Sequence, residues 1–88
     1  METVTETYTT ANLYMVAAAV IDGVPYNDSR FEMGKRLLVS FDSSRIEDFL
    51  TKWKNGNMNL DARKYGDVLR FLFRCAKRKE TLPLVFTL

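Results

Sequence analysis

The residues with the most distinctive chemistry are basic side chains near the C-terminal end of the sequence. They recur at positions i, i+7, i+11, i+14 and i+15, namely Arg63, Arg70, Arg74, Lys77 and Arg78. In an α-helix this spacing gathers the five side chains on the face opposite the apolar residues. Such a face is suited to neutralise the phosphates of nucleic acid or to contact an acidic protein surface. It is also compatible with a solvated outer face, because basic residues near a helix C-terminus stabilise the helix dipole without a partner.

The charge of the chain is divided unevenly along its length. The 88 residues include 13 Lys and Arg residues and 11 Asp and Glu residues, which gives a formal net charge of +2. Residues 1–60 carry 6 basic and 8 acidic side chains, whereas residues 61–88 carry 7 basic and 3 acidic side chains, so the two net charges are −2 and +4. The basic excess therefore belongs to the segment that holds the five spaced cations.

The absence of histidine removes most familiar catalytic arrangements. Ser-His-Asp and Cys-His nucleophiles, histidine metal sites and the commonest general base near neutral pH all need this residue. Cys75 is the only cysteine, so neighbouring cations alone would have to lower its pKa for it to act as a nucleophile. The sequence therefore predicts a domain that is not an enzyme, with a tyrosine- or carboxylate-based enzyme as the alternative.

The carboxylates and glycines form no recognisable ligand motif. Glu47 and Asp48 are neighbours on a predicted helix, so their side chains diverge and are unsuited to paired acid-base work. The aspartates at positions 22, 28, 42 and 61 lack the spacing of a carboxylate metal loop, and the glycines at positions 23, 34, 56 and 66 are too scattered to cradle a phosphate. We therefore expect no metal and no cofactor.

Aromatic and apolar residues mark further candidate contact surfaces. Tyr26 lies among polar, turn-forming residues, so we expect an exposed ring and a second contact surface around Tyr26 and Arg30. Phe71 and Cys75 lie four residues apart and form a second apolar strip on the basic helix, which is either buried within the chain or forms a homodimer interface. Trp53 has the spacing of a core residue, although an indole before a turn also suits base stacking or a partner contact.

Three amphipathic helices are predicted to position these side chains, because apolar residues recur at i, i+3, i+4 and i+7 between capping residues. They run from a cap at Thr9 or Thr10 to Gly23, from Ser44 with a capping-box Glu47 to Gly56, and from Asp61 to about Lys79. The apolar stripe of the third helix consists of Tyr65, Val68, Leu69, Leu72, Phe73 and Ala76.

Strands are predicted between and beyond these helices. Residues 3–8 and 35–41 have a β-favouring composition, and residues 82–86 form a terminal strand that we expect to pair with residues 3–8. Residues 24–34 are rich in turn-forming residues and are predicted to form a loop, with a very short strand at its start as the alternative. The expected fold is a single compact α+β domain over residues 1–88, with three helices packed on a small, largely antiparallel sheet.

The sequence gives no sign of export or membrane insertion. The longest apolar run, residues 13–21, has nine residues, about half of what a membrane-spanning helix needs. The N-terminus is acidic and polar, unlike a signal peptide, and a single cysteine favours a reducing compartment. We therefore expect no membrane partner and a cytoplasmic location, in the host if the protein is viral.

Four segments of the sequence carry a family resemblance. They are a Thr-started helix rich in small residues, a strand ending in an aromatic, a helix closing on aromatic-x-Asn-Gly and a Tyr-containing basic helix. In the same order, these segments are Thr9 to Gly23, Arg36 to Phe41, Ser44 to Gly56 and Asp61 to Arg78. In this order, over about 70 residues, the sequence resembles an uncharacterised family of small phage and bacterial domains of unknown function. The resemblance implies a viral or mobile-element setting and no established chemistry, and the sequence departs from it in residues 25–34 and in its apolar C-terminal tail.

Three classes of binding function fit these observations. The first is a non-catalytic domain that contacts nucleic acid or a nucleoprotein through the basic third helix. The second is a small viral inhibitor, anti-CRISPR-like, that binds and blocks a host or defence protein. The third is an oligomeric binder of a phosphate-bearing small molecule. The five spaced cations favour nucleic acid over protein as the partner.

Overall fold

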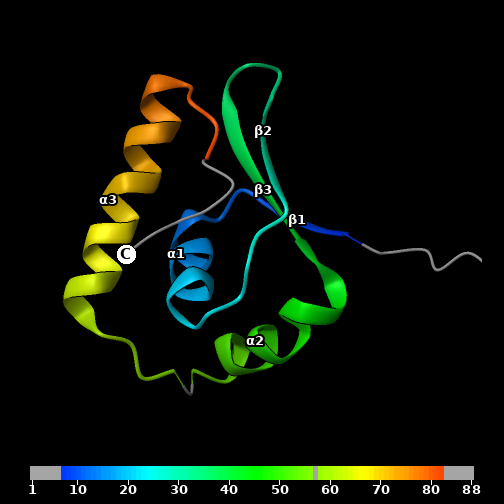
Figure 1. Cartoon of the computed structure of the whole chain (residues 1–88), viewed down its shortest axis with the longest axis vertical. Coiled ribbons are helices and arrows are strands. Elements are labelled where there is room, and N and C mark those ends of the chain that lie inside the picture. Colours follow the sequence, from blue (N-terminus) through cyan, green and yellow to red (C-terminus); the bar gives the residue numbers. More distant parts are fainter. Residues whose placement is uncertain (1–6, 57, 83–88) are drawn as a thin grey trace, which may run out of the picture.

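Three strands pair in an antiparallel sheet with the order β1-β3-β2, and three helices pack around it (Figure 1). The computed structural model describes residues 7–56 and 58–82. Along the chain the elements are β1 (Thr7–Thr10), α1 (Leu13–Ile21), β2 (Asp28–Glu32), β3 (Arg36–Asp42), α2 (Ser43–Asn55) and α3 (Ala62–Arg78). The predicted α+β class is therefore confirmed.

The central strand β3 is the most buried element of the sheet. Residues 37–41 are all buried, because β3 has a neighbouring strand on each side and α2 packs against it. This strand was expected at residues 35–41, and the structure confirms it with a shift of one residue. Its buried Ser40 has a partner, since its hydroxyl lies 3.0 Å from the hydroxyl of Thr9 on β1.

The N-terminal boundary between strand and helix differs from the prediction. Thr9 and Thr10, expected to cap the first helix, belong to β1 and pair with Ser40 and Val39. The cap of α1 is Asn12, whose side-chain oxygen accepts a hydrogen bond of 3.3 Å from the amide of Met15. Asparagine is at least as good an N-cap as threonine, so local preference did not favour the earlier start.

The segment expected to be a loop contains a strand. Residues 28–32 form β2, which pairs with residues 36–40 of β3 around a hairpin turn. Met33 and Gly34 occupy the turn with φ of 52° and 68°. Just before the strand, the main-chain amide of Asn27 donates a hydrogen bond of 2.8 Å to the carbonyl of Ser40, which holds the start of β2 against β3. Pairing with the buried strand thus overrides the local turn preference.

The second helix begins earlier than expected, whereas the first begins later. It starts at Ser43 with Asp42 as the N-cap residue, so Ser44 and Glu47 do not occupy the capping-box positions and that prediction is wrong. The carboxylate of Asp42 makes no capping bond and instead accepts a hydrogen bond of 2.7 Å from the side chain of Asn27. At the other end Gly56 has φ of 69°, which confirms the predicted left-handed C-cap.

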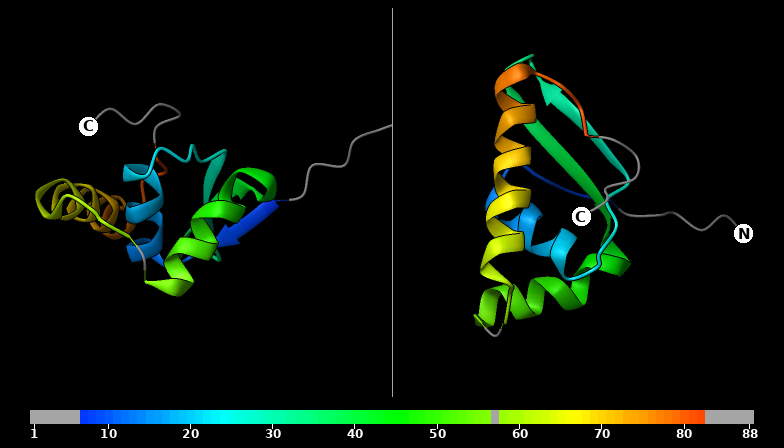
Figure 2. Two further views of the ribbon diagram at one scale, coloured as in Figure 1. Left: turned by 90° about the horizontal axis from the view of Figure 1, so that it is seen from below. Right: turned by 60° about the vertical axis from the view of Figure 1, so that its left-hand side comes forward.

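The helix α1 lies at the centre of the molecule, with α3 on one side and α2 on the other (Figure 2). Five consecutive residues of α1, from Met15 to Ala19, are buried, and the alanines among them permit close packing. The helix α3 therefore forms an outer layer that contacts α1 with one face. After α3, the amide of Leu82 donates to the hydroxyl of Ser29 on β2 at 2.7 Å. Apart from Leu82, the predicted terminal strand of residues 82–86 lies outside the described residues.

Candidate functional site

The helix α3 is defined by specific residues at both ends. The side chain of Asp61 accepts hydrogen bonds from the amides of Arg63 and Lys64 at 2.9 and 3.1 Å, which confirms the predicted N-cap. Lys79 ends the helix in the left-handed conformation, with φ of 57°. The buried side chains of α3 are Val68, Leu72 and Cys75. One face of the helix is thus fixed against the core, and the opposite face is left to solvent.

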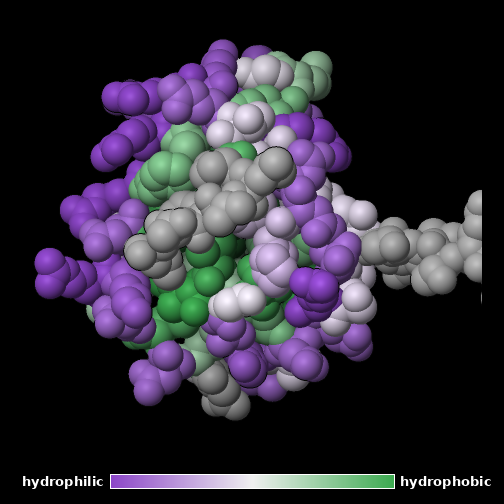
Figure 3. All heavy atoms as spheres, in the orientation of Figure 1, coloured by the Kyte–Doolittle hydropathy of each residue, from purple (hydrophilic) through white to green (hydrophobic). Residues whose placement is uncertain are grey.

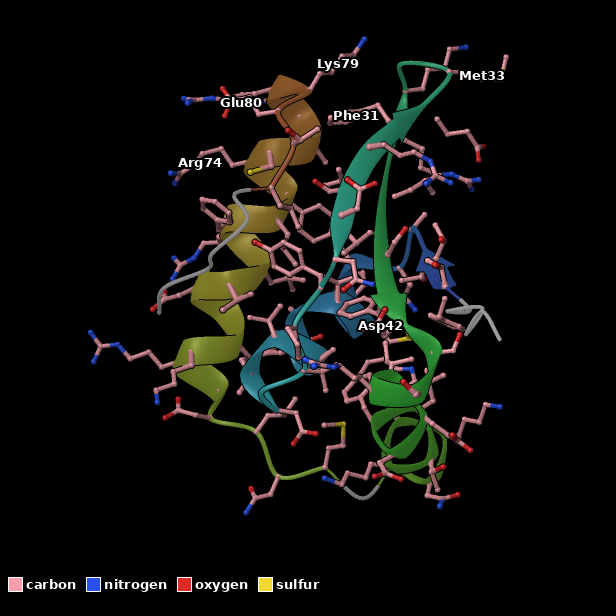
Figure 4. The ribbon with its side chains drawn as sticks, turned by 45° about the vertical axis from the view of Figure 1, so that its right-hand side comes forward. Phe31, Met33, Asp42, Arg74, Lys79 and Glu80 are labelled. Carbon is pink, nitrogen blue, oxygen red and sulfur yellow. The ribbon has the colours of Figure 1, made fainter. Side chains whose placement is uncertain are left out.

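The five predicted cations all lie on that opposite face. Each is exposed, and none contributes to the core; they are Arg63, Arg70, Arg74, Lys77 and Arg78, called here the α3 basic face. A helix rises 1.5 Å per residue, so the face extends over about 22 Å. Figure 3 shows hydrophilic side chains along the edge of the molecule where α3 lies, and Figure 4 shows Arg74 extending away from the β2–β3 hairpin.

Most of this charge has no counterpart nearby. Arg70 forms an ion pair with Asp67, which lies one turn earlier on the same face. The other four cations form no ion pair with any carboxylate of residues 7–56 and 58–82. Among the described residues, the α3 basic face therefore carries an excess of positive charge that Asp67 balances only in part.

Four of the five cations also surround a depression in the surface. This open hollow, of about 580 Å³, is lined by Arg70, Phe73, Arg74, Lys77 and Arg78. Arg63, nearer the start of the helix, lies outside it. The hollow therefore combines a cationic rim with one aromatic side chain, and an anion with an attached planar group matches both parts.

The exposure of Phe73 was missed from the sequence. Its ring was expected in the apolar stripe of α3, but it is 43% exposed. At 100° per residue, Phe73 lies at the edge of the stripe centred on Leu72, so it falls between the core and the basic residues. Helical periodicity alone indicates this position at the edge of the stripe. The ring was expected to be buried because phenylalanine is apolar.

A second exposed aromatic lies beside Phe73. Tyr14, at the start of α1, is 54% exposed and meets the ring of Phe73 edge to face, with ring centroids 5.6 Å apart and an interplanar angle of 69°. The Tyr65 hydroxyl donates a hydrogen bond of 3.1 Å to the Tyr14 carbonyl. Sequence reasoning did not single out Tyr14, because only the packing of α1 against α3 brings it to this site.

The two residues of the predicted second contact surface, Tyr26 and Arg30, differ in exposure. Tyr26 is half-buried and packs against the core, so the expectation of an exposed ring is wrong, and burial raises the pKa of its hydroxyl. Arg30 is exposed on β2. A contact surface around these two residues stays a prediction.

The two residues proposed for a homodimer interface lie on the core side of α3. Cys75 is 5% exposed, and Phe71 is half-buried and packs against the core. Burial raises the pKa of the Cys75 thiol, which keeps it protonated at neutral pH. The strip formed by these two residues is thus used largely within the chain, and a homodimer stays a prediction.

The indole of Trp53 has an aromatic neighbour within the chain. Trp53 is half-buried and stacks on Phe49, with ring centroids 6.0 Å apart and an interplanar angle of 25°.

Within residues 7–56 and 58–82, no three cysteine or carboxylate side chains come together in a group that could hold a metal ion. None of the helices in the same part of the chain combines the length and apolar character that crossing a bilayer requires.

Comparison of the chain with protein-family models, with curated proteins and with solved structures found no match. The resemblance to small phage and bacterial domains therefore stays a prediction.

Proposed function

We propose that this protein is a non-catalytic domain that binds nucleic acid through the α3 basic face. The observation that carries the proposal is the exposure of five cations on one helix face, four of which have no carboxylate partner in the described part of the chain. A row of such cations over about 22 Å suits a polyanion with regularly repeated charges. Arginine accounts for four of the five, and its planar guanidinium group donates two parallel hydrogen bonds to a phosphate.

Stabilisation of the helix dipole explains only part of this pattern. Lys77 and Arg78 lie in the last turn of α3, where positive charge is favourable without a partner. Arg63 lies in the first turn, where the same dipole disfavours positive charge, and Arg70 lies in the middle of the helix. The solvated-face alternative therefore does not account for the whole row, whereas phosphate binding does.

The proposal is tested by fluorescence anisotropy of labelled DNA and RNA, single- and double-stranded, at several salt concentrations. We expect affinity to fall with salt, with a log-log slope that corresponds to no more than about five neutralised phosphates. The variant Arg74→Glu/Lys77→Glu should lose most of the binding. Its matched control is Lys35→Glu/Lys54→Glu, which alters the net charge equally at exposed lysines of the hairpin turn and of α2.

Two outcomes contradict the proposal. Unchanged anisotropy with all four nucleic acids at low salt removes nucleic acid as the partner and leaves an acidic protein surface. An equal loss of binding in the control variant shows that net charge, and not the α3 basic face, determines binding. Circular dichroism of both double variants establishes that each has kept its fold.

A further inference from the structure

We infer that the nucleic acid is single-stranded and that one of its bases stacks on the aromatic pair formed by Tyr14 and Phe73. This inference rests on the proposed function. It starts from the observation that the rings come from different helices and are both largely exposed, at 54% and 43%. Exposed aromatics beside a cationic groove are the arrangement with which proteins bind single strands, because every base has a face that can stack.

The position of Phe73 within the basic face supports this reading. Phe73 lines the same hollow as Arg70, Arg74, Lys77 and Arg78. On a helix it neighbours Arg70 at i−3 and Lys77 at i+4, so a stacked base would have its own and adjacent phosphates close to these cations. In a duplex the base faces are covered by the neighbouring base pairs, and the rings of Phe73 and Tyr14 would have nothing to stack on.

The aromatic pair is held in place before any ligand binds. The edge-to-face contact fixes Phe73 against Tyr14, and the hydrogen bond from Tyr65 to the Tyr14 carbonyl ties the main chain of the same residue to α3 two turns earlier. Less side-chain freedom is therefore lost on binding than for isolated surface rings. By contrast Met33, the most exposed large apolar side chain among the described residues at 89%, lies at the hairpin turn, away from α3 (Figure 4).

The test compares three labelled probes of equal length at one low salt concentration. They are a single strand of mixed sequence, the same sugar-phosphate strand without bases, and a duplex. The unmodified protein should bind the single strand with bases between about fivefold and about a hundredfold more tightly than the strand without bases, since stacking contributes roughly this factor per base. It should also prefer the single strand to the duplex.

Substitutions then locate the effect. Phe73→Leu keeps an apolar side chain on the helix but removes the ring, so it should remove the preference for bases and leave binding to the base-free strand unchanged. Phe73→Tyr should retain the preference. The control Met33→Leu, at the exposed hairpin turn, should behave as the unmodified protein does.

The outcomes separate this inference from the proposed function. Equal affinity for strands with and without bases, or a duplex bound at least as tightly as the single strand, overturns the stacking inference and leaves phosphate binding by α3 intact. A preference for bases that survives Phe73→Leu overturns the assigned site. No binding of any probe at low salt overturns the proposed function as well.

Discussion

The hydroxyl of Tyr65 on α3 donates a hydrogen bond to the main-chain carbonyl of Tyr14 on α1, across 3.1 Å and 51 residues of sequence. Together with the contact between the rings of Tyr14 and Phe73, it joins Tyr14 to α3 at two positions that lie two helical turns apart. The aromatic pair therefore depends on a helix contact that neither helix specifies alone.

Removal of this hydrogen bond should weaken both stability and recognition. Tyr65→Phe keeps the ring that packs against the core and should lower the free energy of unfolding by about 0.5–1.5 kcal/mol, the net contribution of one such bond. Denaturant unfolding measures this change. Tyr14→Phe is the matched control, because no hydrogen bond of the Tyr14 hydroxyl is found among the described residues. Equal losses in the two variants would contradict the importance of the Tyr65 bond.

The α3 basic face should contribute little to stability. Lys77→Glu should lower the free energy of unfolding by up to about 1 kcal/mol, because it places a negative charge in the last turn of α3. Arg74 is exposed and forms no ion pair with described carboxylates, so Arg74→Glu should change the free energy of unfolding by less than about 0.5 kcal/mol. Arg70→Glu should cost slightly more, because it places a second carboxylate beside Asp67. Thermal unfolding measures these effects. A large loss of stability in all three variants would show that the cations are structural.

Neutralising Asp67 should strengthen the binding of nucleic acid. Of the acidic groups in the described part of the chain, its carboxylate alone pairs with the α3 basic face, at Arg70. Asp67→Asn removes this competition, so affinity for nucleic acid should rise severalfold, and the salt slope should steepen by up to about one phosphate contact. Asp48→Asn, an exposed carboxylate on α2, is the control with the same change of charge. Anisotropy titrations of both variants at several salt concentrations provide the test, and an unchanged or reduced affinity of Asp67→Asn would count against phosphate binding at Arg70.

The basic face was predictable because it depends on one helix only. Helical periodicity places Arg63, Arg70 and Arg74 on the same side, and Asp61 is a strong local start signal. The strand β2 was not predictable in this way, since it begins with the turn-forming Asp28 and Ser29 and becomes a strand by pairing with β3. The aromatic pair was missed for the same reason: Tyr14 and Phe73 are far apart in the sequence and meet through helix packing.

The two predicted helix caps should now differ in their contribution. Asp61 receives two amide hydrogen bonds, so Asp61→Ala should lower the free energy of unfolding by about 1 kcal/mol, within a usual range of about 0.5–2 kcal/mol. Ser44 lies inside α2 and is exposed, so Ser44→Ala should have almost no effect. Denaturant unfolding of both variants compares them directly. A loss of about 1 kcal/mol in Ser44→Ala would mean that the capping box forms after all and that α2 begins later.

Stability should fall at alkaline pH because of Cys75. Burial raises the pKa of its thiol above the value of about 8.5 that it has in the unfolded chain. Above that pH the unfolded chain has lost the proton that the folded chain still holds, so unfolding becomes more favourable as pH rises through the folded pKa. The slope for one such group is at most about 1.4 kcal/mol per pH unit.

Cys75→Ala separates this effect from packing. The variant loses core contacts and should be less stable at every pH, but it should lack the fall in the free energy of unfolding that the Cys75 thiol causes in the unmodified protein above about pH 8.5. Above about pH 10 both proteins should lose stability, because burial also raises the pKa of Tyr26 and Tyr65. Denaturant unfolding across this pH range measures the two profiles. Parallel profiles above about pH 8.5 would show that the thiol has the same pKa in the folded and unfolded chains, and would contradict a net rise of its pKa on folding.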